Sequence, residues 1–226
     1  MAKTVSVVAA FAVIWAVPAV AVDWTGYASI GTDYIYRGVS LLDSGPALQG
    51  GVEGRFADNF IAGVSAVKID RQWLYYQDVN DHVQVDVYAG ADFGCGPNCR
   101  ARVLVSRYEF PGPDTRDWTE ATASVEFFDR FGASYSWSPE GLGSNVITRT
   151  TEAWLQQPFS LATSAELGYG RVAISRFNYW YAHVGVSHRL GHFVFGLTQY
   201  VGDPGLKHLL FDSHSNRLVL TVSTAF

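Results

Sequence analysis

The sequence has 226 residues, with 16 Lys and Arg against 21 Asp and Glu, and its formal net charge is -5 at pH 7. This balance leaves no basic footprint, so neither nucleic acid nor anionic lipid surfaces are expected as primary partners. Aromatic residues make up 15% of the chain, with 22 Gly and 1 Met, which favours strands and turns over helices. We expect one mostly β domain.

Residues 1–21, MAKTVSVVAAFAVIWAVPAVA, have the layout of a secretory signal peptide. Lys3 precedes an apolar stretch at residues 5–17, and Ala19 and Ala21 have the small side chains that a signal peptidase requires. The alternative is a membrane-anchor helix, but the apolar core is short and no stop-transfer flank follows it. We therefore expect a cleaved signal at residues 1–21 and one domain at residues 22–226.

Two segments alternate strictly between apolar and polar residues. In residues 82–93, HVQVDVYAGADF, the positions from Val83 to Phe93 on one parity are apolar, and the other parity carries Gln84, Asp86 and Asp92. Residues 117–128 repeat this pattern with acids on one face. A period of two over about ten residues is typical of a strand that spans a membrane in a barrel.

The same pattern predicts about twelve strands, within a range of roughly ten to fourteen. They are expected near residues 24–40, 46–56, 60–68, 82–93, 101–110, 117–128, 131–137, 148–159, 163–171, 179–190, 192–201 and 215–226. Tight turns are expected at residues 57–59, 129–130, 160–162 and 191, and longer loops at 68–81, 138–147, 172–178 and 202–214. Short turns at one end and long loops at the other are typical of an outer-membrane barrel.

Aromatic residues flank both kinds of connection, as in the two aromatic girdles of a membrane barrel. Beside the tight turns are Phe56, Phe60, Phe93, Phe127, Phe131, Phe159, Phe193 and Phe226. Beside the long loops are Trp118, Trp137, Tyr179, Trp180 and Tyr200. A soluble β-sandwich or a lipocalin-like barrel stays as the alternative, since its strands alternate too, with the apolar parity buried inside.

The chain ends in SNRLVLTVSTAF, a strand that closes on an aromatic residue. Leu218, Leu220, Val222 and Phe226 share one parity. A terminal Phe after such a strand resembles the signal by which bacterial outer-membrane proteins are recognised for insertion. We therefore expect Phe226 to act as an insertion signal, with outer-membrane lipids and the barrel-assembly machinery as partners.

Residues 33–54, DYIYRGVSLLDSGPALQGGVEG, resemble the N-terminal motif of the TorF-type porin family of proteobacterial outer-membrane proteins. The matching residues are Asp33, Tyr34, Arg37, Gly38, Ser40, Pro46, Ala47, Gln49, Gly50 and Gly51. Similar segments are VDVYAGADFG at 85–94, YEFPG at 108–112 and FGASYSWS at 131–138, so the resemblance covers nearly all of the chain after residue 21. It implies an outer-membrane barrel more clearly than it implies a solute. The turn with Cys95 and Cys99 departs from the family pattern.

The inward parity is unusually acidic. The acids expected to line the lumen are Asp33, Glu53, Asp86, Glu120, Glu126, Glu152 and Glu166, and their possible partners are Arg37, Arg55, Arg189 and Arg217. One interpretation is a pore whose carboxylates favour cations, so that small polar solutes or cations diffuse through it. The other is a small barrel filled with ion pairs that conducts little or nothing. For Asp33, Tyr34, Arg37 and Gln49 a structural role across the first strand pair is preferred to ligand binding.

Few other residues suggest chemistry. Cys95 and Cys99 flank Gly-Pro-Asn, and a disulfide in an oxidising compartment is expected there. His183 and Ser187 share a parity, but no nucleophile motif accompanies them. We therefore expect no catalytic residue, no metal site and no cofactor, and a lipid-modifying enzyme or a non-conducting surface barrel stays as the alternative to a porin.

Overall fold

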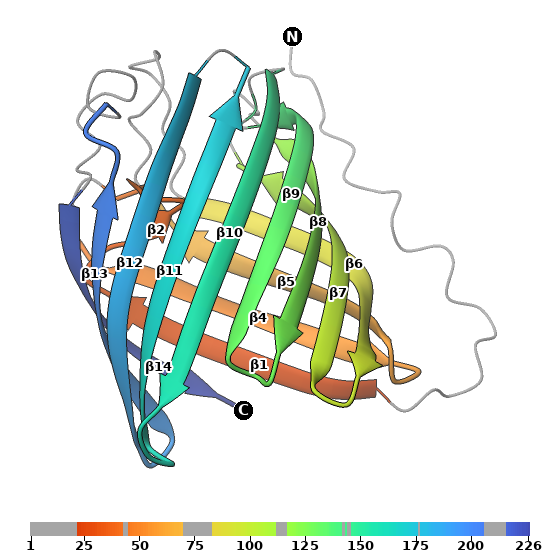
Figure 1. Ribbon diagram of the computed structural model, residues 1–226, viewed down its shortest axis with the longest axis vertical. Helices are drawn as coiled ribbons and strands as arrows, with labels where there is room; N and C mark the ends of the chain where they lie inside the picture. The colour runs from red at the N-terminus through yellow and green to blue at the C-terminus, as the bar shows by residue number, and fades with distance from the viewer. Residues whose placement is uncertain are drawn as a thin grey trace, which may run out of the picture.

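The computed structural model describes residues 22–42, 45–69, 83–111, 117–141, 143, 146–175, 177–205 and 216–226. Among these residues twelve antiparallel strands form one closed barrel (Figure 1). The barrel strands are β1 Val22–Gly31, β4 Ala47–Phe56, β5 Phe60–Lys68, β6 Val83–Gly96, β7 Cys99–Glu109, β8 Trp118–Phe127, β9 Phe131–Gly141, β10 Val146–Pro158, β11 Thr163–Ile174, β12 Phe177–Leu190, β13 Phe193–Gly202 and β14 Asn216–Ala225. The expected all-β antiparallel barrel of about twelve strands is confirmed.

Each barrel strand pairs with its neighbour in sequence, and β14 closes the barrel on β1. The closing pair runs from Tyr27 opposite Ala225 to Gly31 opposite Thr221. Beyond it, Gly26 and Phe226 exchange two backbone hydrogen bonds of 2.7 and 2.9 Å. The seam is therefore closed by backbone hydrogen bonds from Gly26 to Gly31 of β1, and such closure satisfies backbone groups that would be costly to leave unpaired in a membrane.

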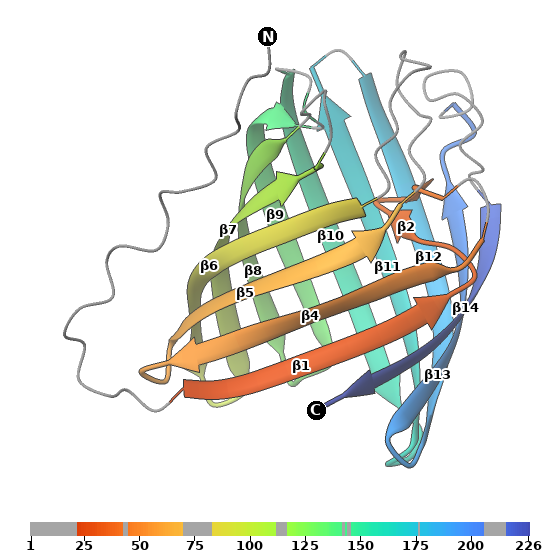
Figure 2. The ribbon, with the colours of Figure 1, turned by 180° about the vertical axis from the view of Figure 1, so that it is seen from behind.

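The two ends of the barrel differ in their connections. Tight turns at residues 57–59, 97–98, 128–130, 159–162 and 191–192 lie at one end, here called the turn end. At the other end, the loop end, lie the strand ends Gly31, Ala47, Lys68, Val83, Glu109, Trp118, Gly141, Val146, Ile174, Phe177, Gly202 and Asn216 (Figures 1 and 2). The long loop expected at 172–178 is wrong, because β11 and β12 stay paired as far as Ile174 and Phe177.

The outer wall of the barrel is apolar and its interior polar. Val87, Leu167 and Leu220 are 47%, 53% and 56% exposed, whereas Gln84 and Thr150 face inward and are 1% exposed. A soluble barrel of the lipocalin type would bury the apolar parity, so this inverted alternation argues against that alternative. No helix of the described residues has the length and apolar character needed to cross a bilayer.

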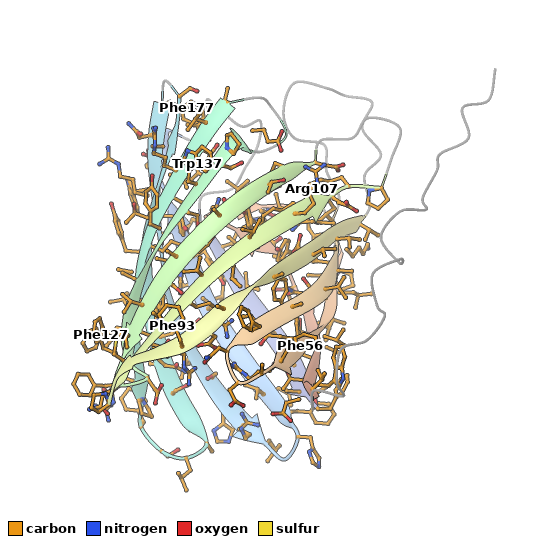
Figure 3. The ribbon with its side chains drawn as sticks, turned by 90° about the vertical axis from the view of Figure 1, so that its right-hand side faces the viewer. Phe56, Phe93, Arg107, Phe127, Trp137 and Phe177 are labelled. Carbon is orange, nitrogen blue, oxygen red and sulfur yellow. A yellow bond between two sulfur atoms is a disulfide. The ribbon has the colours of Figure 1, made fainter. Side chains whose placement is uncertain are left out.

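The aromatic residues at the turn end form a ring on the outer wall. Phe60, Phe93, Phe131, Phe159, Phe193 and Phe226 are all exposed there, and Phe56 packs edge-on against Trp24. At the loop end only part of the expected aromatic girdle lies on the outer wall. Trp137 is exposed there (Figure 3), and Trp180 belongs to the outward-facing parity of β12. Trp118, Tyr179 and Tyr200 face the lumen instead, because each shares the parity of inward polar residues.

The first strand is shorter than expected. It was predicted over residues 24–40, but β1 ends at Gly31, and the chain turns into the barrel. Two short strands, β2 Ile35–Tyr36 and β3 Val39–Ser40, pair there as a separate hairpin (Figure 2). The predicted signal peptide at residues 1–21 lies outside the described residues.

Candidate functional site

A hairpin inside the barrel is the centre of the candidate site. We call residues 34–41 the inner hairpin. Its first and last residues lie side by side, because the Leu41 amide donates a 2.9 Å hydrogen bond to the Tyr34 carbonyl. Its two turn residues, Arg37 and Gly38, have φ of 50° and 78°, the left-handed geometry of a two-residue hairpin turn. A Cβ on Gly38 would lie 2.4 Å from the Tyr181 Cβ, so the turn also needs glycine for its close approach to β12.

The inner hairpin belongs to the main apolar cluster of the molecule. Val39 and Leu41 are 3% and 2% exposed. They pack in one cluster with residues from five barrel strands or their ends, namely Val67, Ile69, Phe110, Trp118, Val172, Ile174, Tyr179 and Tyr181. The core of this barrel is therefore at the loop end of the lumen, and the sequence 33–42 supplies one side of it.

Trp118 anchors the opposite side of this cluster. Its ring stacks on Tyr108 at 4.7 Å and on Phe110 at 5.2 Å, and Tyr36 of the inner hairpin lies 6.4 Å away. Large aromatic rings in contact contribute area burial and favourable ring geometry together. The cluster therefore holds the hairpin against β7 and β8.

A buried ion pair locks the tip of the hairpin. The Arg37 guanidinium donates two hydrogen bonds of 2.7 Å to the Glu120 carboxylate of β8, and the two side chains are 9% and 3% exposed. The guanidinium also lies 4.9 Å above the Tyr36 ring. A bidentate fork of this kind fixes both distance and orientation. The sequence suggested an Arg fork across the first strand pair, whereas the fork reaches across the lumen.

The base of the hairpin is fixed by Asp33. Its carboxylate accepts hydrogen bonds of 2.7 Å from the Tyr34 amide and the Ser40 hydroxyl, and it lies 3.6 Å from the Arg217 Nε of β14. Burial raises the pKa of the Tyr34 and Tyr36 phenols well above their usual value, so both stay neutral. The hairpin thus has a polar anchor at each end and an apolar middle.

Nearer the turn end, one side of the lumen carries arginines that are already paired. Asp92 of β6 lies 3.0 Å from Arg55, 2.8 Å from Arg102 and 3.9 Å from Arg100. Glu53 lies 3.9 Å from Arg102 and accepts a hydrogen bond from Tyr88. We call this network the arginine wall: it comprises Arg55, Arg100 and Arg102 with the acids Glu53 and Asp92, and it lies on β4, β6 and β7.

Three other lumen acids form no ion pair with a described residue, although Glu126 lies opposite Arg100 in the register of β7 and β8. We call Glu126, Glu152 and Glu166, on β8, β10 and β11, the acid wall. Within the described part of the chain none of them forms an ion pair, and they accept hydrogen bonds from neutral groups only. Glu126 accepts from the Trp154 indole and Glu166 from the Thr198 hydroxyl, at 3.4 and 3.3 Å.

A cavity of about 330 Å³ lies along this wall. Its lining includes Glu152, Trp154, Glu166, Tyr181 and His183. The Tyr181 phenol donates to Glu152, so the cavity begins directly beside the cluster that contains the inner hairpin. The cavity, the carboxylates of Glu152 and Glu166 and the inner hairpin therefore lie on the same side of the barrel.

The remaining expected lumen residues are spread along the barrel. Asp86 accepts hydrogen bonds from Gln84 and Ser65, at 2.8 and 3.4 Å. Arg189 shares the inward parity of β12 and is exposed near the turn end. Gln49 donates a 3.0 Å hydrogen bond to the Tyr27 hydroxyl across β1 and β4, the first strand pair, where the sequence placed a structural role for it. These residues belong to neither wall.

Cys95 and Cys99 are joined by a disulfide across the turn between β6 and β7, with their Cα atoms 5.0 Å apart. The turn lies at the turn end, far along β6 from the inner hairpin's contacts. Among the described residues no group of His, Cys, Asp and Glu is arranged to hold a metal ion.

The aromatic residues around the hairpin were missed as site residues in the sequence. Strand parity could have identified them: Trp118 lies two residues before Glu120 on β8, so both side chains face the lumen. Tyr181 likewise shares a parity with His183. A large ring on the polar parity, close to the loop end, indicates that something fills the lumen there.

Several solved structures to which this chain is similar are outer-membrane porins or channels. The KdgM porin aligns with 89% of this chain and 99% of its own, with a TM-score of 0.54 and 10% identity. The NanC porin aligns with 90% of this chain and 99% of its own, with a TM-score of 0.57 and 6% identity. An outer membrane channel from Pseudomonas putida covers 93% of this chain and 96% of its own, with a TM-score of 0.51 and 8% identity. At these identities the likeness establishes the fold alone.

The search of curated proteins found no match to the sequence. A family described as "Bacterial protein of unknown function (Gcw_chp)" matches residues 16–225, which include every barrel strand. With nearly the whole chain matched, this protein belongs to the Gcw_chp family of bacterial proteins.

Proposed function

We propose that this protein is an outer-membrane channel through which small polar solutes, and cations in preference to anions, diffuse passively. The observation that carries the proposal is the acid wall, whose carboxylates have no ion-pair partner among the described residues and of which Glu152 and Glu166 border a cavity of about 330 Å³. Carboxylates of this kind lower the free energy of a cation in a narrow lumen and raise that of an anion.

In this proposal the inner hairpin is the constriction. It occupies the loop end of the lumen on the side of β5, β8, β11 and β12, where its apolar residues pack in the main cluster. Solutes pass beside it, along the acid wall. The lining would then comprise Asp33, Arg37, Glu53, Asp86, Glu120, Glu126, Glu152, Glu166, Arg189 and Arg217, with Arg37 and Glu120 neutralising each other.

The outer membrane is the location that the outer wall supports. The exposed aromatic ring at the turn end and the apolar belt above it fit a bilayer. The signal-like residues 1–21 and the terminal Phe226 support export followed by insertion through the barrel-assembly machinery. The resemblance of residues 33–54 to the TorF-type porins supports the same location, and we propose that this chain belongs with them.

The solute of a structurally similar porin is not proposed as the solute of this protein. One structure of the KdgM porin, with a TM-score of 0.54 to this chain, is of its complex with disordered oligogalacturonate. Galacturonate units are anionic, and the acid wall would repel them. We therefore propose cations and neutral polar molecules as solutes here.

The test is the ion selectivity of the refolded protein in planar bilayers. In a gradient of KCl the reversal potential of the wild type should indicate cation preference. Glu126→Gln with Glu166→Gln should move it by a measurable amount towards zero, because two lumen charges are lost. The matched control, Glu109→Gln, removes an exposed acid of the outer parity and should leave the potential unchanged. A wild type without cation preference would contradict the proposal.

A non-conducting barrel is the second candidate, and the inner hairpin is the observation that favours it. A hairpin held by a buried ion pair and an apolar cluster could seal the lumen. An enzyme finds less support: the Ser187 hydroxyl contacts the Ser164 hydroxyl at 2.9 Å, and the His183 ring lies against Tyr200 rather than beside a nucleophile. We propose that the protein is not an enzyme.

A further inference from the structure

Two arginines on adjacent strands, β10 and β11, point outward from the barrel near the loop end. Arg149 of β10 and Arg171 of β11 are both exposed and share the outward parity of their strands. Arg149 pairs in register with Ala173, two residues from Arg171, so the two side chains are diagonal neighbours. Such neighbours lie close enough for long side chains to reach one group together.

A tryptophan stands beside each arginine. Trp137 of β9 is directly opposite Arg149, and Trp180 of β12 is directly opposite Arg171. Four adjacent strands therefore present Trp, Arg, Arg and Trp across one face, here called the outer arginine face. Figure 3 shows Trp137 near the loop end of the wall. Indole rings at this height are typical of the boundary between hydrocarbon and headgroups.

Neither arginine has a partner among the described residues. No hydrogen bond or ion pair joins Arg149 or Arg171 to any described group. Arg107, on the same outer wall, is different: its guanidinium lies 3.1 Å from Asp117 and 3.5 Å from Glu140. The outer arginine face is thus a local positive charge that the protein itself does not compensate.

The surface on the turn-end side of these arginines is apolar and aromatic. Tyr169, two residues before Arg171 on the same parity, is 53% exposed, and Tyr135, Leu167 and Val184 are 46%, 53% and 55% exposed. An arginine that faced hydrocarbon would be costly, about 2 to 4 kcal/mol at the midplane and less towards the interface. Both guanidinium groups are therefore best placed at the headgroup level, with the acyl chains below them.

We infer that the outer arginine face binds the phosphate of an anionic lipid headgroup in the leaflet at the loop end. This inference rests on the proposed location in a membrane. The planar fork of each guanidinium matches phosphate oxygens, and the Thr151 hydroxyl, opposite Arg171 on the same outward parity, adds a possible donor. The overall charge of -5 excludes a broad basic surface but not a local pair of this kind.

The test uses the full refolded barrel with diphosphoryl lipid A as the probe. Folding is first checked by the heat-dependent gel shift and by insertion into phosphatidylcholine vesicles, and lipid binding is then measured by native mass spectrometry from detergent. The wild type should bind the lipid, and Arg149→Gln with Arg171→Gln should weaken binding by about tenfold or more, since each charge-assisted contact is lost. Trp137 and Trp180 stay in place in this variant.

The control is Arg107→Gln, which removes a paired arginine from the same outer wall. It should change the affinity by less than about twofold, and millimolar inorganic phosphate should not compete for the lipid site. Equal affinity in wild type and double variant would overturn the inference, as would an equal loss in Arg107→Gln or full competition by inorganic phosphate. A barrel that inserts and binds lipid but carries no current would count against the proposed channel alone, whereas failure to insert would remove the basis of both.

Discussion

At the residue scale, the contact between Arg37 and Glu120 matters most for stability and for the position of the inner hairpin. The two form a buried bidentate pair that joins the inner hairpin to the barrel wall. A buried pair contributes little relative to apolar residues of the same volume, but removal of one partner leaves an uncompensated charge. The pair is therefore a sensitive point for both stability and the position of the hairpin.

Arg37→Leu should lower the free energy of unfolding by about 3 to 5 kcal/mol, because Glu120 then stays buried without a counter-charge. The measurement is urea unfolding of the refolded barrel in detergent. Adding Glu120→Gln should recover part of the loss, since the orphaned charge is gone. The exposed pair of Arg107 offers the comparison: Arg107→Leu should cost at most about 1 kcal/mol. Equal effects at the two sites would contradict the assignment of a buried lock.

Gly38→Ala tests the close approach of the hairpin to β12. The added Cβ would meet the Tyr181 Cβ at 2.4 Å, and the φ of 78° disfavours any side chain. We expect a loss of stability of about 1 to 3 kcal/mol, from the strained backbone, together with larger conductance steps as the hairpin shifts. Gly191→Ala is the control, since its positive φ is similar but nothing lies within 4 Å. If both variants behave alike, the contact with β12 is not what holds the turn.

At the element scale, the inner hairpin and the disulfide turn have separate roles. The disulfide closes a loop with a sequence separation of 4 at the turn end, away from the constriction. Chain-entropy reasoning for so short a loop gives a contribution to stability of about 2 kcal/mol. Cys95→Ser with Cys99→Ser should thus lower the unfolding free energy by roughly that amount and leave conductance and selectivity unchanged. A change in selectivity would place this turn in the solute path.

The sequence predicted the barrel strands better than it predicted what fills them. Residues 60–68 coincide with β5, and several other expected strands fall within a few residues of the observed ones, because period-two alternation is a local property. The predicted first strand, residues 24–40, ran too far, because β1 ends at Gly31 and residues 34–41 form the inner hairpin. The packing of Val39 and Leu41 in the main cluster and the ion pair between Arg37 and Glu120 show that these residues turn inward.

The candidate site was predictable in composition but not in its pairing. Parity places Glu120, Glu126 and Glu152 on the inner face, as the sequence indicated. Which of them meets an arginine depends on contacts across the lumen, between residues 83 apart in the case of Arg37 and Glu120. No local sequence pattern carries that information. The division of the lumen residues into an arginine wall and an acid wall could therefore be recognised only from the three-dimensional structure of the closed barrel.

At the scale of the whole molecule, the apolar outer wall implies a barrel that is stable only in a membrane or detergent. Val105→Arg, on the outward parity near the middle of β7 and between Ala89 and Ala121, should reduce the membrane-inserted fraction, because a charge at the midplane of the lipid face costs about 2 to 4 kcal/mol. Flotation of vesicles after refolding measures that fraction. Asp86→Asn, which changes an inward side chain of the neighbouring strand β6, is the control and should insert normally. Normal insertion of Val105→Arg would contradict the assignment of the two faces.

The most direct test of the account is the single-channel conductance of the wild type beside a variant without the hairpin tip. Residues 35–40 can be replaced by Gly-Gly, because the 2.9 Å hydrogen bond from the Leu41 amide to the Tyr34 carbonyl is the bond that closes a two-residue turn, and Glu120→Gln in the same variant removes the orphaned charge. We predict small cation-preferring steps for the wild type and larger steps for the variant. Two folded barrels that both carry no current would contradict the channel and favour a sealed structural barrel.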